Sequence, residues 1–468
     1  MGASSSKGTY PDWRVINMTV QAGELDSTFA NDGILNWEFP EFVSIAPHAV
    51  LSLPDGRLLV VANEAVRFPG FVVARLTEEG RLDVGSGFGE NQQGFARIST
   101  GDKILLGKFR ASLLSNGGVL VTVEYASRSS GEGGFVEIQL LPDGRLNDKF
   151  GEGGVVTFPS FSIPTTLNRG ARFARAGQNS SHDDQPSIQS SAHSGASGIE
   201  LSDGKIALVS SGIDPATRQT KGLVVRLNPD GTFDSTFNKT GSATVELTEL
   251  GPAAINAASG VAVQADGGLV VYGTFSDEGT LGVYAVRFTT DGIRDDKFRT
   301  TILSSGRLPT FRDIAVRKKD GIIALVGGQD VEGWVGGEGV IVVLSADGSP
   351  HPLFNNGQPL YTKVVPEIGQ TWSSCAFGDG DESKLIVAGS SGGVFTTDET
   401  HAVCARYCLT GELDSEFNGS GWVSFNKPEK LEFGLDLQVT AQNKIVICGE
   451  YVRLSGLPSS GWIARFIA

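Results

Sequence analysis

The sequence predicts an all-β fold, a seven-bladed β-propeller built from four-stranded antiparallel blades. One phrase of sequence recurs along the chain, and a hairpin signal recurs in phase with it. Glycine is abundant, with 62 residues among 468. Because the apolar residues fall in short β-branched runs between glycine-rich turns, the composition is typical of an all-β protein.

The first phrase is clearest at Val224–Phe237, which reads VVRLNPDGTFDSTF. An apolar strand ends near Arg226, a turn is centred on Asp230–Gly231, and Asp234 and Phe237 follow. Further copies stand at Val73–Phe88, Glu137–Phe150, Ala285–Phe298, Val342–Phe354 and Cys404–Phe417, and one more is divided between Ile463–Phe466 and Gly23–Phe29. The chain therefore carries seven copies of one unit, the signature of a repeat architecture.

The second phrase is a tight turn followed by an apolar strand. It occurs at Asp55–Glu64, Asn116–Tyr125, Asp203–Gly212, Asp266–Phe275, Asp320–Gln329, Glu382–Ser391 and Gln442–Tyr451. Asp-Gly and Asn-Gly between apolar runs are strong hairpin signals, because the favoured two-residue turns need positive φ. Each unit is therefore strand A, tight turn, strand B, longer loop, strand C, tight turn and strand D, which describes a propeller blade.

The split copy predicts how the ring closes. The N-terminal segment Gly23–Phe39 supplies strand D to a last blade whose other strands come from Phe433–Ala468, and this closure removes free sheet edges. We expect one domain over residues 21–468, preceded by a flexible extension over residues 1–20. Only the interval from Phe150 to Phe237 is much longer than the others, because of an insertion at residues 162–197.

These phrases resemble the delta-60 repeat family of predicted bacterial β-propellers over Gly23–Ala468. The resemblance implies a propeller fold and a bacterial source, and it supplies no catalytic residues. The fifth copy departs most from the pattern, with Pro350–Pro352 where other copies read Leu-Asp.

A charged pair is predicted within each unit. The end of strand C carries Arg75, Gln139, Arg226, Arg287, Val343, Arg406 and Arg465, and the matching later position carries Asp83, Asn147, Asp234, Asp295, His351, Asp414 and Asp26. Where the arginine is lost the aspartate is lost too. Removing one partner of a shielded ion pair leaves a costly lone charge, so the series predicts structural Arg–Asp pairs rather than a ring of anion-binding arginines.

Composition narrows the function classes. The formal net charge is −15 with no basic run, which argues against nucleic acid or an anionic membrane as a partner. No apolar run is long enough to span a membrane, and Met1–Val20 lacks the apolar core of a signal peptide.

We expect a monomer, cytoplasmic by default, with signal-independent secretion as an alternative. Gly2 and Ser6 fit an N-myristoylation pattern, but the motif is short and often accidental, so a flexible start is favoured over acylation. The four cysteines are expected to be buried small hydrophobes.

The long B–C and D–A connections share one face, where we expect function to lie. The candidate binding residues are Arg67, Phe68, Tyr125, Arg128, Arg169, Arg172, His182, Trp334, Phe395, Tyr451 and Arg453. Aromatic and arginine side chains of this kind anchor many interfaces. The insertion is expected to be a polar flap, and a metal site at His182–Asp184 with His193 is not favoured, because these residues lack fixed ligand spacing.

Signals for catalysis are few. The five histidines occupy no equivalent blade positions, which leaves little for a histidine metal centre or a nucleophile triad. We therefore expect no enzyme, no cofactor and no metal, but a binding module for a protein or carbohydrate partner. Two alternatives stay open: a lectin-like carbohydrate binder, and a hydrolase or lyase with a carboxylate-based site at the central channel. The latter would show shifted carboxylate pKa values there.

Overall fold

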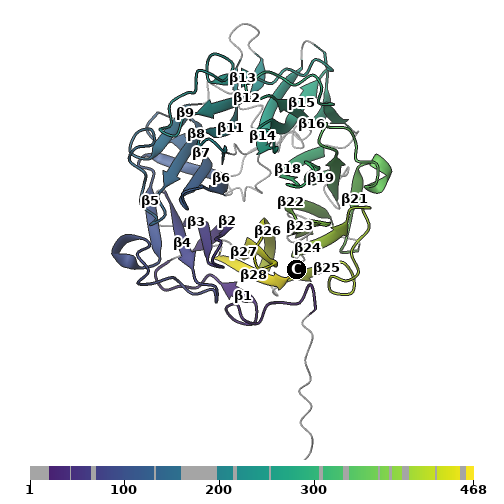
Figure 1. The fold of residues 1–468 in the computed structure, drawn as a ribbon. Helices are drawn as coiled ribbons and strands as arrows, with labels where there is room; N and C mark the ends of the chain where they lie inside the picture. Colours follow the sequence, from purple (N-terminus) through teal and green to yellow (C-terminus); the bar gives the residue numbers. More distant parts are fainter. Residues whose placement is uncertain are drawn as a thin grey trace, which may run out of the picture.

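The structure is a computed structural model. It describes residues 21–42, 44–64, 70–130, 133–159, 198–213, 219–251, 254–304, 309–329, 337–366, 369–378, 382–392, 400–426, 430–453 and 460–468. Within these ranges the strands form seven four-stranded sheets arranged as a ring (Figure 1). Neighbouring strands in each sheet are antiparallel, so the predicted fold class is confirmed. No helix in the described part is long and apolar enough to cross a membrane.

Blades 1 to 4 follow one another in chain order. Blade 1 comprises β2 (Ile45–Ser52), β3 (Leu58–Glu64), β4 (Gly70–Leu76) and β5 (Phe95–Ser99). Blade 2 comprises β6 (Lys103–Leu113), β7 (Val119–Ser127), β8 (Gly133–Leu140) and β9 (Val155–Pro159). Blade 3 comprises β10 (Gly198–Glu200), β11 (Ile206–Ile213), β12 (Thr220–Leu227) and β13 (Ser242–Thr244). Blade 4 comprises β14 (Ile255–Val263), β15 (Leu269–Asp277), β16 (Thr280–Phe288) and β17 (Thr301–Ser304).

Blades 5 to 7 complete the ring. Blade 5 comprises β18 (Pro309–Val316), β19 (Ile323–Gln329), β20 (Glu338–Leu344) and β21 (Leu360–Thr362). Blade 6 comprises β22 (Gln370–Phe377), β23 (Lys384–Ser391), β24 (His401–Cys408) and β25 (Trp422–Phe425). Blade 7 comprises β26 (Lys430–Val439), β27 (Lys444–Arg453), β28 (Ser460–Ile467) and β1 (Ile34–Asn36). Short 3-10 turns, η1 (Glu90–Gln92) and η3 (Asn355–Gly357), lie between blade strands.

The ring closes as predicted. Strand β1, from the start of the described chain, pairs antiparallel with β28, with Ile34 opposite Ala464 and Asn36 opposite Trp462. The N-terminal strand is thus the outermost strand of blade 7 (Figure 1). The predicted extension over residues 1–20 lies outside the described residues.

The signature phenylalanines pack each blade against the next. Phe237 of blade 3 is fully buried, and a Cβ added at Gly292, in the C–D turn of blade 4, would lie 2.9 Å from its ring. Gly292 has φ +78°, a conformation that favours glycine. Asn238 N donates to Asp291 O of the same turn at 2.8 Å. The repeated phrase that ends in Phe237 therefore forms a turn within its own blade and also contacts the next blade.

The predicted Arg–Asp pairs are present. Nε donates to the aspartate at 2.7 Å in Arg75–Asp83, 2.6 Å in Arg226–Asp234, 2.7 Å in Arg406–Asp414 and 2.9 Å in Arg465–Asp26, and Arg287 pairs with Asp295 through Nη1. In blade 2 the amides of Asn147 and Gln139 replace the pair with a hydrogen bond.

A second cation, which the sequence analysis missed, accompanies four of these pairs. The residue after the A–B turn contacts the same aspartate at 2.9 Å (Arg57), 3.1 Å (Lys205), 2.9 Å (Lys384) and 3.4 Å (Lys444). Gly118, Gly268 and Ile322 hold this position in blades 2, 4 and 5. Blades 2 and 5 therefore lose all three charges together, a signal that was visible in the repeats.

Candidate functional site at the axis of the ring

The innermost strands carry irregularities that aim polar side chains at the axis. Register shifts interrupt the pairing of β2, β6, β14, β18, β22 and β26 with their second strands. A β-bulge bends its strand and re-aims side chains. The residues directly after these shifts occupy one level of the ring: Ala49, Arg110, Gly260, Asp313, Ser374 and Asp436. We use "axial cluster" for His48, Lys108, Arg110, Asp313, Ser374 and Asp436.

The cations of the axial cluster both come from β6. Arg110 Nη2 donates to Arg312 O at 2.6 Å and lies 3.3 Å from Tyr272 OH, while Nη1 lies 3.7 Å from Asp313 Oδ1. Lys108 Nζ donates to Leu435 O in β26. The side chains of Arg110 and Asp313 keep 15 % and 20 % of their surface exposed, so water reaches this level.

The carboxylates of the axial cluster are joined by one serine. Ser374 Oγ lies 2.8 Å from Asp313 Oδ2 and 3.2 Å from Asp436 Oδ1. Each carboxylate also accepts a backbone N–H from another blade, Cys375 N at 3.0 Å for Asp313 and Val50 N at 3.0 Å for Asp436. The cluster thus links blades 5, 6, 7 and 1 through charge-assisted hydrogen bonds.

Burial shifts the titration of three members of the cluster. It lowers the pKa of the Lys108 ammonium and raises the pKa of the Asp436 carboxyl. Burial, together with the charge of Lys108, lowers the pKa of His48 to about 3. His48 is therefore neutral, and its Nδ1 accepts from Phe109 N at 3.3 Å. Groups whose pKa values are moved by burial and by a charged neighbour are typical of functional sites, and also of structural networks.

The loop side of the axis is more open at blade 2. Ile104 and Leu106, which precede Lys108 on β6, are 42 % and 37 % exposed. On the adjoining second strands, burial raises the pKa of Glu124 and of Glu450 to about 7. Glu124 and Glu450 hold equivalent positions in blades 2 and 7. Glu124 lies four residues after Leu120, which pairs with Gln139, and Glu450 lies four residues after Val446, which pairs with Arg465. Shifted carboxyl pKa values thus occur at Asp436 in the axial cluster and on the second strands of blades 2 and 7.

Of the candidate binding residues, only Tyr125, Arg128 and Tyr451 have side chains that the structure describes. Tyr125 lies in β7 and Tyr451 in β27, and both are buried rather than presented on loops. The Nζ atoms of Lys103 and Lys430 lie 5.5 Å and 3.7 Å from the centres of their rings. Arg128 is exposed beside β7. Arg67, Phe68, Arg169, Arg172, His182, Trp334, Phe395 and the side chain of Arg453 lie outside the described residues, as does the whole 162–197 insertion.

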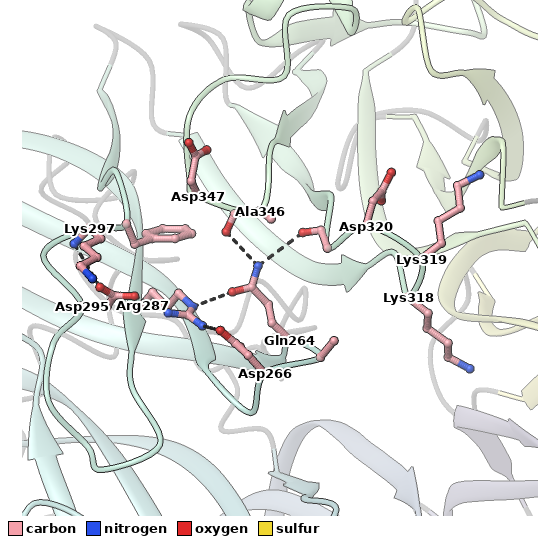
Figure 2. Close-up of a pocket in the computed structure, with 13 residues that line it drawn as sticks. Gln264, Asp266, Arg287, Asp295, Lys297, Lys318, Lys319, Asp320, Ala346 and Asp347 are labelled. Atoms are coloured by element: carbon pink, nitrogen blue, oxygen red, sulfur yellow. Dashed lines mark hydrogen bonds and ion pairs between the residues drawn. The ribbon is translucent and has the colours of Figure 1, made fainter.

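Among the described residues, two pockets open on the side of the ring that carries the tight turns. One, of about 400 Å³, lies between blades 4 and 5 and is lined by Gln264, Asp266, Arg287, Lys297, Lys318 and their neighbours (Figure 2). Gln264 accepts from Arg287 Nε at 2.6 Å and donates to Ala346 O at 2.9 Å. The other, of about 580 Å³, lies at the seam of the ring between Lys384 and Ala468.

The pocket in Figure 2 has a structural origin. In blade 3, Arg226 Nη1 donates directly to Thr290 O in the turn of the next blade. In blade 4, Gln264 makes the matching contact to Ala346 O, and Arg287 turns toward Gly268, where an added Cβ would lie 2.1 Å from its guanidinium. The pocket therefore lies where Gln264 replaces the arginine that makes the contact between blades in blade 3. The lysines at its rim point away from Gln264 (Figure 2).

Comparison with known proteins supports the fold. Residues 201–237 and 264–298, in blades 3 and 4, match the family described as a domain of unknown function (DUF5122) beta-propeller. No curated protein sequence is significantly similar to the chain.

Solved structures of similar arrangement have low sequence identity. The polysaccharide lyase Uly1 has a TM-score of 0.47 and 8 % identity, covering 90 % of each chain. An ulvan lyase bound to -[GlcA(1-4)Rha3S]- has a TM-score of 0.43 and 11 % identity, covering 94 % of this chain and 95 % of the lyase. The β-propeller domain of the Trilobed protease from Pyrococcus furiosus has a TM-score of 0.41 and 8 % identity, covering 91 % and 94 %.

The expectation that the chain is not an enzyme is corrected by these comparisons. The solved structures that match the chain include two polysaccharide lyases and a post-proline cleaving enzyme from Rickettsia typhi. Because function resides in sites carried by a fold, a scarcity of histidines does not by itself exclude catalysis. The chain is similar to β-propellers in sequence over two blades and in structure over most of its length.

Proposed function

We propose that the protein binds an anionic, hydroxyl-rich ligand, an acidic saccharide, at the axial cluster. The observation that carries the proposal is the convergence of Lys108, Arg110, Asp313 and Asp436 on the ring axis from strands of three blades. These side chains are brought there by bulges, which re-aim side chains next to many functional sites.

The donor set fits such a ligand. A lysine ammonium has three donors, and one of those of Lys108 goes to Leu435 O. The guanidinium of Arg110, with its fixed fork of donors, suits carboxylate or sulfate oxygens. Asp313 and Asp436 are acceptors for ligand hydroxyls. In a chain of net charge −15, the two cations at the axis would give a bound anion a local attraction.

A second candidate function is cleavage of the bound saccharide. It is favoured by the raised pKa of Asp436, beside the cations of β6, and by the pKa values of about 7 at Glu124 and Glu450. A carboxyl group that keeps its proton near neutral pH can act as a general acid, and the same group can act as a base once ionised.

Binding and cleavage are tested together with purified full-length protein. Calorimetric titration with uronic-acid oligosaccharides measures binding, and the appearance of new reducing or unsaturated ends measures cleavage. We expect Lys108→Met and Asp436→Asn to weaken binding about tenfold or more, which corresponds to ~1.4 kcal/mol. Arg145→Ala is the matched control, because Arg145 lies in the same blade with an exposed side chain.

The outcomes separate clearly. Binding by the wild type that is lost in the two axial variants, with the melting temperature largely kept, supports the axial site. Binding that survives both substitutions places recognition elsewhere. Failure of the wild type to bind any acidic saccharide refutes the proposed ligand class.

A further inference from the structure

We infer that the axial site is closed on its turn side, so that it admits the end of a saccharide chain and not an internal segment. This inference rests on the proposed function and specifies the form of ligand that the site takes. Its basis is a pair of contacts that cross the ring from one strand, β6.

Arg110 makes the longer crossing. It starts in blade 2 and reaches Arg312 O in blade 5 at 2.6 Å, passing Tyr272 OH of blade 4 at 3.3 Å. In a ring of seven, blades 2 and 5 lie on opposite sides (Figure 1). One side chain therefore spans the axis.

Lys108 makes the second crossing. Its Nζ donates to Leu435 O in blade 7, past blade 1. His48 of blade 1 accepts a hydrogen bond from Phe109 N, the residue after Lys108, at 3.3 Å. The crossings of Lys108 and Arg110 diverge from β6 toward different blades, so together they cover more of the ring than either alone.

Both acceptors belong to bulge residues. Arg312 stands between the paired residues Phe311 and Asp313, and Leu435 stands between Gly434 and Asp436. A bulge leaves its extra residue outside the regular ladder, and a buried carbonyl without a partner is costly. Lys108 and Arg110 donate hydrogen bonds to these carbonyls. Because loss of either hydrogen bond would leave a carbonyl without a partner, we expect both contacts to remain when ligand binds.

The crossings lie below the open part of the axis. Strand β6 runs from the loop side to the turn side, and Ile104 and Leu106, on the loop side of Lys108, are 42 % and 37 % exposed. A ligand that enters from the loop side therefore meets Lys108 and Arg110 as a floor. On this inference a polymer that enters along the axis stops at the floor, and one terminal unit occupies the site.

The test compares free and capped ligands on the full chain. A uronic-acid oligosaccharide of one fixed length is prepared in three forms: free at both ends, methylated at the non-reducing end, and converted to the methyl glycoside at the reducing end. We expect at least one cap to weaken binding to the wild type about tenfold or more by calorimetry. In Arg110→Met the loss caused by that cap should shrink, because the floor is opened.

Equal affinity of the wild type for the free ligand and for both of the capped ligands overturns the closed-end inference while leaving the axial site in place. Absence of binding to every form overturns the proposed function itself. The capping comparison on the wild type needs no variant to fold, and Arg145→Ala again serves as the control for Arg110→Met.

Discussion

Arg465 and Asp26 stand 439 positions apart in the sequence and form an ion pair, in which Arg465 Nε donates to Asp26 Oδ2 at 2.9 Å. Both residues are 4 % exposed. Nη1 of Arg465 continues to Glu78 O of blade 1 at 2.6 Å. This pair fastens the two ends of the described chain to each other and to the first blade, so it acts where the ring would otherwise open.

Removal of residues 462–468 should sharply lower stability. A chain ending at Gly461 loses Arg465 and nearly all of β28, which lies between β27 and β1 in blade 7. β1 then has no partner strand, and the ring gains free edges. Thermal unfolding followed by circular dichroism measures the effect. A melting temperature equal to that of the full chain would contradict the role given to this closure.

The Arg–Asp pairs should show coupling in a double-mutant cycle. Arg226→Gln alone leaves Asp234 without its closest cation, and breaking such a shielded pair costs about 3–5 kcal/mol. Adding Asp234→Asn should restore part of the loss, because it recreates the Gln139–Asn147 hydrogen bond of blade 2. Lys205, 3.1 Å from Asp234, limits the loss in the single variant. Strictly additive losses in urea unfolding would show that the two residues are not coupled.

The repeats made the ring, its closure and the Arg–Asp pairs predictable. Each of these depends on local phrases, such as the Asp230–Gly231 turn, or on positions that change together between copies, such as Gln139 with Asn147. Comparison of one copy with another inside the chain supplied the information that a spatial contact requires.

The axial cluster was not predictable in the same way. Lys108 and Arg110 stand in a run, KILLGKFRASLL, with no turn signal. The bulge that aims them at the axis is marked in the sequence only by Gly107, which has φ +71°, and a glycine inside a strand does not say which side chains it re-aims. Their partners come from blades 5 and 7, far away in the sequence. The cluster also varies between copies, because a site at the axis is used once by the whole ring, so comparing repeats does not reveal it.

Close contact between the closing blade and blade 1 should make Gly461 intolerant of substitution. An added Cβ at Gly461 would lie 1.9 Å from Pro47 Cδ. Because Pro47 is rigid, Gly461→Ala should destabilise by about 1–3 kcal/mol, the usual cost of overpacking. Gly378→Ala is the control, since its nearest contact would be 3.6 Å. Equal unfolding free energies for the two variants would show that blades 7 and 1 can separate without cost.

The carboxyl group of Glu137 should make the protein less stable as pH rises. Glu137 is 1 % exposed in β8, and burial raises its pKa to about 8 despite the hydroxyl of Thr122, which lies 2.8 Å and 2.9 Å from its two oxygens. In the unfolded chain this group ionises near its ordinary value of 4.5. Between these values the unfolded state has released the proton that the folded state retains, so the free energy of unfolding falls with increasing pH and levels off above about 8.

Glu137→Gln removes this titration while keeping the size of the side chain and a hydrogen bond to Thr122. The variant should match the wild type near pH 4 and become more stable than it as pH rises, by up to a few kcal/mol at alkaline pH, given ~1.4 kcal/mol per unit of pKa shift. Urea unfolding at a series of pH values from about 4 to about 9 gives the difference directly. A difference that stays constant over this range would mean that Glu137 ionises alike in the folded and unfolded chain, and that its contact with Thr122 is an ordinary carboxylate hydrogen bond.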